Sequence, residues 1–105
     1  MTDPVVAVVG GGISGLVAAY RLRGALGPDA RIVVLERSPR LGGKLHTVDL
    51  ANGPVDVGAE AFIARRPEGP ALLDELGLSD QVVHPSGARP LLYAGGRLRP
   101  LPAGT

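Results

Sequence analysis

The sequence predicts an α/β fold that opens with a strand–helix–strand unit and continues into short β-hairpins. Three observations lead to this prediction. Val5–Val9 is a nearly continuous run of β-branched residues, Ile13–Leu26 has apolar residues at roughly helical spacing, and Arg31–Glu36 is a second apolar run. Neither run alternates apolar with polar residues, which is typical of strands buried on both faces of a parallel sheet. The order strand, helix, strand therefore predicts a right-handed, parallel βαβ unit.

The predicted helix has features that favour close packing on a sheet and a defined end. Gly15, Ala18 and Ala19 are small enough to let the helix lie near the strands. Gly27 and Pro28 follow its last apolar residue, and this pair ends a helix because glycine adopts the left-handed conformation and proline lacks an N–H group.

The pattern changes after Glu36, because eight of the ten prolines lie beyond it. Asn52-Gly53 is a typical hairpin turn, and Gly95-Gly96 indicates a second turn with Leu98 on the returning strand. The remaining elements are predicted from short apolar runs. They are strands at 45–50, 54–57, 81–84 and 91–93, and one short helix at 70–76.

Composition excludes several classes of protein. Hydrophobic residues make up 45% of the 105-residue chain and the net charge is +1, so the chain can bury a core and has no basic surface for nucleic acid. The absence of cysteine excludes disulfides and thiolate metal sites and favours the cytoplasm. The uncharged stretch 4–20 follows Asp3 and is interrupted by glycines, so we expect neither a signal peptide nor a transmembrane segment.

Gly10-x-Gly12-x-x-Gly15 matches the dinucleotide-binding fingerprint. Gly10 permits a tight turn, Gly12 lets a pyrophosphate approach the backbone, and Gly15 lets helix and strand pack closely. The helix N-terminus near Ile13 and Ser14 offers N–H groups to phosphates. A glycine-rich turn without a ligand is the alternative, which the surrounding strand and helix disfavour.

An acidic residue and a second pair of glycines follow the second strand. Glu36 lies about 20 residues after Gly15, where a carboxylate accepts hydrogen bonds from an adenosine ribose. The fingerprint and Glu36 suit both FAD and NAD. Gly42-Gly43 and Lys44 can approach the same pyrophosphate, and Thr47 can donate its hydroxyl, whereas an NAD-binding domain usually continues into another helix. This segment favours FAD.

Glu36-Arg37 followed by SPRLGGKLHT resembles the R-x-G-G-R/K-x-x-S/T motif of flavin amine oxidase-like proteins. Within that group, GGGISGL, SPRLGGKL, DVGAEAF and GRLRPLPAGT are most similar to the porphyrinogen oxidases. The resemblance covers essentially the whole chain and implies the N-terminal quarter of a longer family member. It implies that residues 1–105 are the first part of a FAD/NAD(P)-binding domain, with a βαβ unit at 5–36, a Gly-Gly motif at 40–47 and a flavin-side loop at 56–62.

The resemblance also implies roles for individual residues. Glu36 would hold the ribose of FAD with Arg37 beside it, and Gly43 and Lys44 would reach the flavin side of the diphosphate, with Lys44 in place of the arginine usual in amine oxidases. The pyrophosphate would lie along Gly10, Gly11, Gly12, Ile13, Ser14 and Gly15, and the isoalloxazine ring along Gly58, Ala59, Glu60 and Ala61.

The activity implied by the resemblance is FAD-dependent oxidation of a porphyrinogen, coproporphyrinogen III or protoporphyrinogen IX, by oxygen in haem biosynthesis. No catalytic residue is assigned. Two alternatives stay open: a non-catalytic fragment that binds FAD weakly or not at all without the remainder of the parent chain, and another flavin amine oxidase-like oxidoreductase. Asp56 is expected to tie down a loop, and His46 and His84 have no neighbours that predict a metal site.

Overall fold

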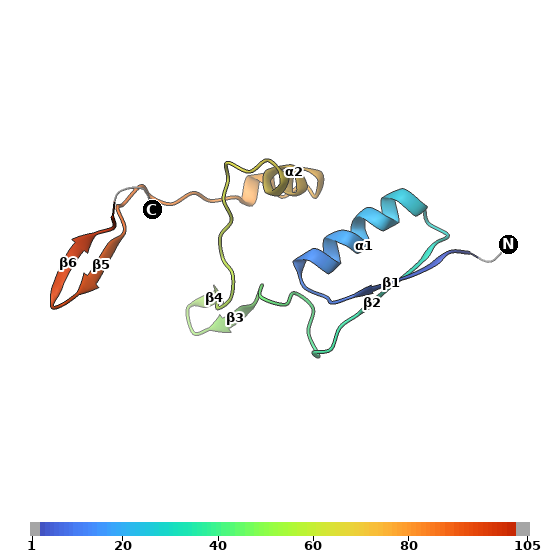
Figure 1. Ribbon diagram of the computed structural model, residues 1–105, viewed down its shortest axis with the longest axis horizontal. Coiled ribbons are helices and arrows are strands. Elements are labelled where there is room, and N and C mark those ends of the chain that lie inside the picture. The colour runs from blue at the N-terminus through green and yellow to red at the C-terminus, as the bar shows by residue number, and fades with distance from the viewer. Residues whose placement is uncertain (1–2, 103–105) are drawn as a thin grey trace. The chain divides into compact units, whose positions relative to one another are not determined.

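The computed structural model describes residues 3–102, and the chain divides into two units, Met1–Phe62 and Ile63–Thr105. Figure 1 labels the elements in chain order. The first unit contains β1 (Val5–Val9), α1 (Ile13–Leu26), β2 (Arg31–Leu35), β3 (Thr47–Leu50) and β4 (Gly53–Asp56). The second contains α2 (Glu68–Glu75), the 3₁₀ helix η1 (Ser79–Gln81), β5 (Leu91–Ala94) and β6 (Arg97–Pro100).

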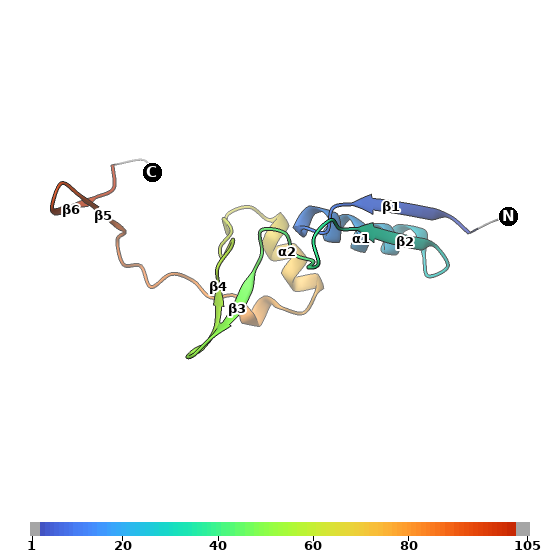
Figure 2. The same cartoon turned by 90° about the horizontal axis from the view of Figure 1, so that it is seen from below.

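The predicted strand–helix–strand unit is present. β1 and β2 pair in parallel, in register from Val5 opposite Arg31 to Val9 opposite Leu35. The helix α1 has the predicted bounds, and β2 ends one residue before Glu36. Figure 1 shows α1 lying along one side of this two-stranded sheet, and in the view of Figure 2 the helix lies behind β1 and β2.

The end of α1 depends on a contact that the sequence pattern did not reveal. Gly27 has φ +82°, and its N–H donates to the carbonyl of Arg23 over 3.1 Å. The Arg23 guanidinium donates to the carbonyls of Gly27, Pro28 and Ala30 over 2.9, 3.1 and 2.7 Å. One side chain therefore donates hydrogen bonds to carbonyl groups that the helix end and the following turn leave without backbone partners.

The expectation that β1 and β2 are buried on both faces is wrong for the described structure. Val6 and Val8 are half-buried, whereas Val9 is 84% exposed. Among residues 3–102, Ala30 is the only buried hydrophobic residue, with an exposed fraction of 3%. The reason is that the sheet has two strands and a helix on one side, so Val5, Ala7 and Val9 of β1 face no packed layer.

The first hairpin agrees with the prediction, with shifted bounds. β3 and β4 pair antiparallel from Thr47 opposite Asp56 to Leu50 opposite Gly53. The ladder continues beyond the strands, because the N–H of Val57 donates to the carbonyl of His46 over 2.8 Å. This extension carries the chain back toward Lys44.

The second unit contains the predicted helix and hairpin but not the predicted strand at 81–84. α2 begins two residues before the expected Pro70 and ends one residue before Leu76, and β5 pairs antiparallel with β6 around Gly95 and Gly96. At 79–82 the N–H groups bond locally, from Gln81 to Leu78 and from Val82 to Ser79. These local bonds form η1 in place of a strand ladder, and Val83 is 89% exposed. In the described part of the chain, no helix combines the length and apolar character needed to cross a membrane.

Candidate functional site: a double-glycine contact beside Glu36

The first glycine turn joins the end of β1 to the start of α1. The N–H of Gly10 donates to the carbonyl of Leu35 over 2.8 Å, and Gly10 has φ +103°, a conformation that favours glycine. A Cβ on Gly15 would fall on the carbonyl oxygen of Gly10. Glycine at position 15 is thus required for the first turn of α1 to lie against the end of β1, as the fingerprint predicts.

The N-terminus of α1 has no side-chain cap. Gly12 is the N-cap residue and has no side chain to bond the first N–H groups of the helix. The first turn of a helix leaves such N–H groups without carbonyl partners inside the helix, and it carries a partial positive charge. Ile13 and Ser14 therefore stand at a position that suits an anion.

Glu36 joins the glycine turn to the segment after β2. The N–H of Gly11 donates to Oε2 of Glu36 over 2.8 Å, and the N–H of Ser38 donates to Oε1 over 2.9 Å. These backbone hydrogen bonds, the one from Ser38 first, lower the pKa of the Glu36 carboxyl, and they outweigh the opposing effect of desolvation. Each carboxylate oxygen keeps acceptor capacity, so an ionised Glu36 can also accept bonds from a hydroxyl-bearing ligand.

The two glycine segments lie against each other. The N–H of Gly42 donates to the carbonyl of Gly11 over 2.7 Å, and Gly12 and Gly42 form an isolated parallel bridge. A Cβ on Gly43 would come within 3.0 Å of the Cα of Gly12. Gly42 and Gly43 also have φ +111° and +59°. Both the backbone conformation and the close approach therefore require glycine at this contact.

Gly11 is buried between two side chains. A Cβ at this position would meet Cδ2 of Leu41 at 2.6 Å and Oε2 of Glu36 at 2.9 Å. The fingerprint left position 11 unspecified. In the structure, a larger residue there would have to displace the ends of two side chains, those of Leu41 and Glu36. The signal that could have revealed this close approach is the run of three consecutive glycines at 10–12.

Arg40 is the first residue of the Gly-Gly motif at 40–47, and the sequence assigned no role to it. Its guanidinium donates to the carbonyls of Leu41, Gly43 and Leu45, over 3.1, 2.8 and 2.8 Å. The N–H of Leu45 closes the same turn onto the carbonyl of Gly42 over 3.0 Å. The sequence signal that corresponds to this arrangement is an arginine two residues before a Gly-Gly pair.

The segment 56–61 approaches the Gly-Gly loop at one point. The N–H of Ala59 donates to the carbonyl of Lys44 over 2.7 Å, and a Cβ on Gly58 would fall on that same oxygen. The resemblance implies that the isoalloxazine ring lies along Gly58, and the structure gives a separate reason for glycine there, the close backbone of Lys44. Glu60 and Ala61 are exposed.

Thr47 and Asp56 form a side-chain pair at the open end of the first hairpin. The Thr47 hydroxyl donates to Oδ1 of Asp56 over 2.5 Å. Asp56 thus ties two chain segments together, as expected. The Thr47 hydroxyl, which we expected to be available to a phosphate, already has a protein partner.

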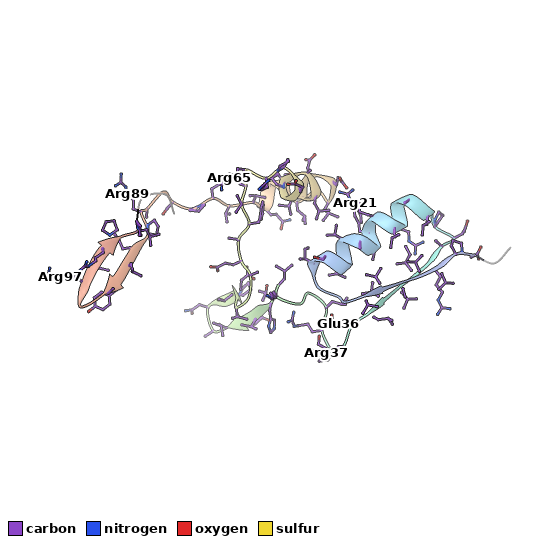
Figure 3. The ribbon with its side chains drawn as sticks, viewed as in Figure 1. Arg21, Glu36, Arg37, Arg65, Arg89 and Arg97 are labelled. Carbon is purple, nitrogen blue, oxygen red and sulfur yellow. The ribbon has the colours of Figure 1, made fainter. Side chains whose placement is uncertain are left out.

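The structure brings Glu36 and the two glycine segments together, whereas the other three charged residues of the predicted site lie at the surface. Arg37, Lys44 and Glu60 are exposed. Figure 3 shows Arg37 next to Glu36 in the segment that follows β2. In the part of the chain that is described, no group of three or more His, Cys, Asp and Glu side chains is arranged to hold a metal ion.

A glycine turn at a helix start, a second glycine loop in contact with it and an ionised carboxylate between them define a candidate site for an anionic ligand that also bears hydroxyl groups. Residues 13–104 match the family model described as flavin containing amine oxidoreductase. The chain belongs to this family of flavin-containing oxidoreductases.

Similar curated proteins include porphyrinogen oxidases. The chain is 58% identical to coproporphyrinogen III oxidase of Mycobacterium tuberculosis over 105 residues, which are 100% of this chain and 23% of that protein. It is 40% identical to human protoporphyrinogen oxidase over 111 residues, covering 94% of this chain and 22% of the human protein. The chain thus spans about a quarter of the length of these relatives.

Solved structures agree with this similarity. The crystal structure of a protein described as a protoporphyrinogen oxidase from Exiguobacterium matches with a TM-score of 0.83 and 33% identity, over 100% of this chain and 23% of that one. Putrescine oxidase bound to putrescine matches with a TM-score of 0.60 and 34% identity, over 73% of this chain and 16% of that one. The fold thus corresponds to part of a flavin amine oxidase.

Proposed function

We propose that the protein oxidises a porphyrinogen, coproporphyrinogen III or protoporphyrinogen IX, with FAD as cofactor and oxygen as the final acceptor, as a step of haem biosynthesis. In this proposal β1, α1 and β2 form the Rossmann-like unit that binds FAD. The observation that carries the proposal is the contact of the two glycine segments beside Glu36, where Gly42 bonds Gly11 over 2.7 Å and Gly11 bonds Glu36 over 2.8 Å.

The residues at this contact fit the diphosphate and ribose of FAD. A helix start whose N-cap, Gly12, has no side chain leaves room and N–H donors for a diphosphate. A Cβ on Gly12 would meet nothing nearer than Cα of Gly43 at 3.9 Å, so the backbone there is open to a ligand. The ionised Glu36 would accept hydrogen bonds from ribose hydroxyls, with Arg37 beside it.

The remaining predicted residues would extend the site toward the ring. Lys44 is exposed and its ammonium would offset phosphate charge on the flavin side. Gly58, Ala59, Glu60 and Ala61 would pass along the isoalloxazine. Bound FAD supplies the capacity to accept a hydride from the substrate, whereas the described residues bind and orient it.

The comparisons favour a porphyrinogen over an amine as the substrate. The matched coproporphyrinogen III oxidase shares 58% identity with the whole chain, whereas the matched putrescine oxidase shares 34% and covers 73% of it. Lys44 replaces an arginine usual in amine oxidases, which agrees with this preference. Amine oxidation is the second candidate function, supported by that structural match.

The test begins with the purified protein at its full natural length. We expect a yellow protein that releases FAD, identified by chromatography after heat denaturation. Porphyrin fluorescence and oxygen uptake should rise with coproporphyrinogen III or protoporphyrinogen IX and not with putrescine. Oxygen uptake with putrescine alone would support the amine oxidase alternative, and a colourless protein that takes up no FAD would support the non-catalytic alternative.

Two variants test the proposed residues. Glu36→Gln and Lys44→Met should each raise the dissociation constant of FAD by about tenfold, the effect of losing one charge-assisted hydrogen bond or ion pair in a partly exposed site. Arg31→Gln is a matched control, because Arg31 is exposed at the start of β2, at the opposite end of the sheet from the glycine turn. FAD affinity unchanged in both variants would contradict the proposed site.

A further inference from the structure

We infer that Arg40 is a positioning residue for the Gly-Gly loop, and that it turns the main-chain N–H of Lys44 outward as a donor for the anionic ligand. This inference rests on the proposed function, because that function supplies the diphosphate. The observation behind it is that one guanidinium holds three carbonyl groups of the same loop, those of Leu41, Gly43 and Leu45.

The orientation of these carbonyls fixes the orientation of the N–H groups that follow them. In a trans peptide the C=O and N–H groups point in opposite directions, and no peptide bond in the described stretch 3–102 is cis. The carbonyl of Leu41 points to Arg40, and the N–H in the same peptide, that of Gly42, donates away from it to the carbonyl of Gly11 over 2.7 Å. In the peptide between Leu41 and Gly42, the carbonyl held by Arg40 thus directs the N–H away from the guanidinium.

The peptide between Gly43 and Lys44 has the same arrangement at its carbonyl end. The Gly43 carbonyl accepts from Arg40 over 2.8 Å, so the N–H of Lys44 points away from the guanidinium. Among residues 3–102 no protein acceptor bonds this N–H. It is therefore available to a ligand, and it belongs to the loop whose Gly43 lies against Gly12.

The guanidinium also changes the electrostatics of the loop. Three carbonyl oxygens with no cation among them would present partial negative charge, which opposes a diphosphate. With Arg40 in place the oxygens are paired with a permanent cation, since arginine is not deprotonated in proteins. Lysine would keep the charge but not the planar set of donors that reaches three carbonyls in fixed directions.

The test compares Arg40→Gln and Arg40→Lys with the control Arg31→Gln, in the protein at full natural length. In the flavin-free form, amide hydrogen exchange should accelerate about tenfold at Gly42 and Leu45 in both Arg40 variants, the change expected from losing one net hydrogen bond. Exchange at Gly10, whose N–H donates to Leu35, should not change. The control should match wild type at all three amides.

The second measurement concerns affinity. Both Arg40 variants should raise the FAD dissociation constant about tenfold, whereas Arg31→Gln should leave it at the wild-type value. Wild-type exchange and affinity in Arg40→Lys would show that charge alone suffices and would overturn the inference. Faster exchange at Gly10 as well as in the loop would also overturn it, since Arg40 would then stabilise the whole unit.

The two readouts separate this inference from the proposed function. If wild type binds no FAD, the proposed function fails. The exchange rates of Gly42 and Leu45 still decide whether Arg40 orders the loop, because they are measured without ligand.

Discussion

Oε2 of Glu36 accepts a hydrogen bond from the N–H of Gly11 over 2.8 Å, across 25 positions of sequence. This bond connects the residue after β2 to the turn after β1, which are neighbours because the two strands pair in parallel. It exists in full strength only while Glu36 is ionised, because a carboxylate accepts more strongly than a neutral acid. It makes the site sensitive to pH.

Glu36 should therefore contribute stability that is lost in acid. Its pKa is lowered in the folded chain, first by the bond from Ser38 and then by the bond from Gly11, so folding stability is present above the unfolded pKa and decreases as pH falls through the folded one. We expect Glu36→Gln to have a flatter stability curve than wild type below about pH 4. Urea denaturation of both proteins between pH 3 and 7 measures this, and parallel curves would contradict it.

Gly15→Ala should destabilise the first unit, whereas Gly24→Ala in the same helix should not. A Cβ at position 15 would fall on the carbonyl oxygen of Gly10, while at position 24 nothing lies within 4 Å. We expect a loss of about 1–3 kcal/mol for Gly15→Ala from forced displacement of the turn. The matched variant Gly24→Ala should gain about 0.5–1 kcal/mol from higher helix propensity. Denaturation followed by circular dichroism measures both, and equal effects would disprove the steric explanation.

The Thr47–Asp56 pair should have a small but measurable coupling energy. The hydroxyl and carboxylate are 2.5 Å apart and exposed, so we expect about 0.5–1 kcal/mol. A double-mutant cycle with Thr47→Val and Asp56→Asn isolates this pair. Thr47→Ser keeps the hydroxyl and is the control. The prediction fails if the two single effects add without coupling.

Gly58→Ala should open the contact between segment 56–61 and the Gly-Gly loop. The added methyl would occupy the position of the Lys44 carbonyl oxygen, which now accepts from the N–H of Ala59 over 2.7 Å. We expect amide exchange at Ala59 to accelerate by about tenfold or more, equivalent to the loss of one hydrogen bond. Gly24→Ala again controls for the added methyl. Unchanged exchange at Ala59 would mean that the backbone adjusts without cost.

Local elements were predictable because their causes are local. The helix at 13–26, the parallel strands around it and the turns at Gly53 and at 95–96 follow from periodicity and from residues that adopt turn conformations. The prediction of a strand at 81–84 was wrong because it too considered only local sequence. Two valines favour a strand, but the chain there has no partner strand and bonds to itself in a 3₁₀ turn.

The candidate site was predictable in its residues and less so in its connections. Gly10, Gly15 and Glu36 occupy fixed spacings that correspond to a known geometry, so their positions in the turn and after β2 were expected. The contacts of Gly11 and Arg40 were not expected. Gly11 meets Leu41 and Glu36, which are distant in the sequence. Arg40 bonds three carbonyl groups of its own loop, whose directions depend on the positive φ angles of Gly42 and Gly43.

The sequence by itself determined the strand–helix–strand order, the hairpins and the glycines that the turns require, since these depend on the conformational freedom of each residue and its near neighbours. Only the tertiary structure decided that Gly42 bonds Gly11, that Gly43 touches Gly12 and that Val9 remains 84% exposed. Contact and burial depend on which other chain segments pack against a residue. A valine-rich strand indicates only that its faces are suited to burial, and it does not determine whether another element covers them.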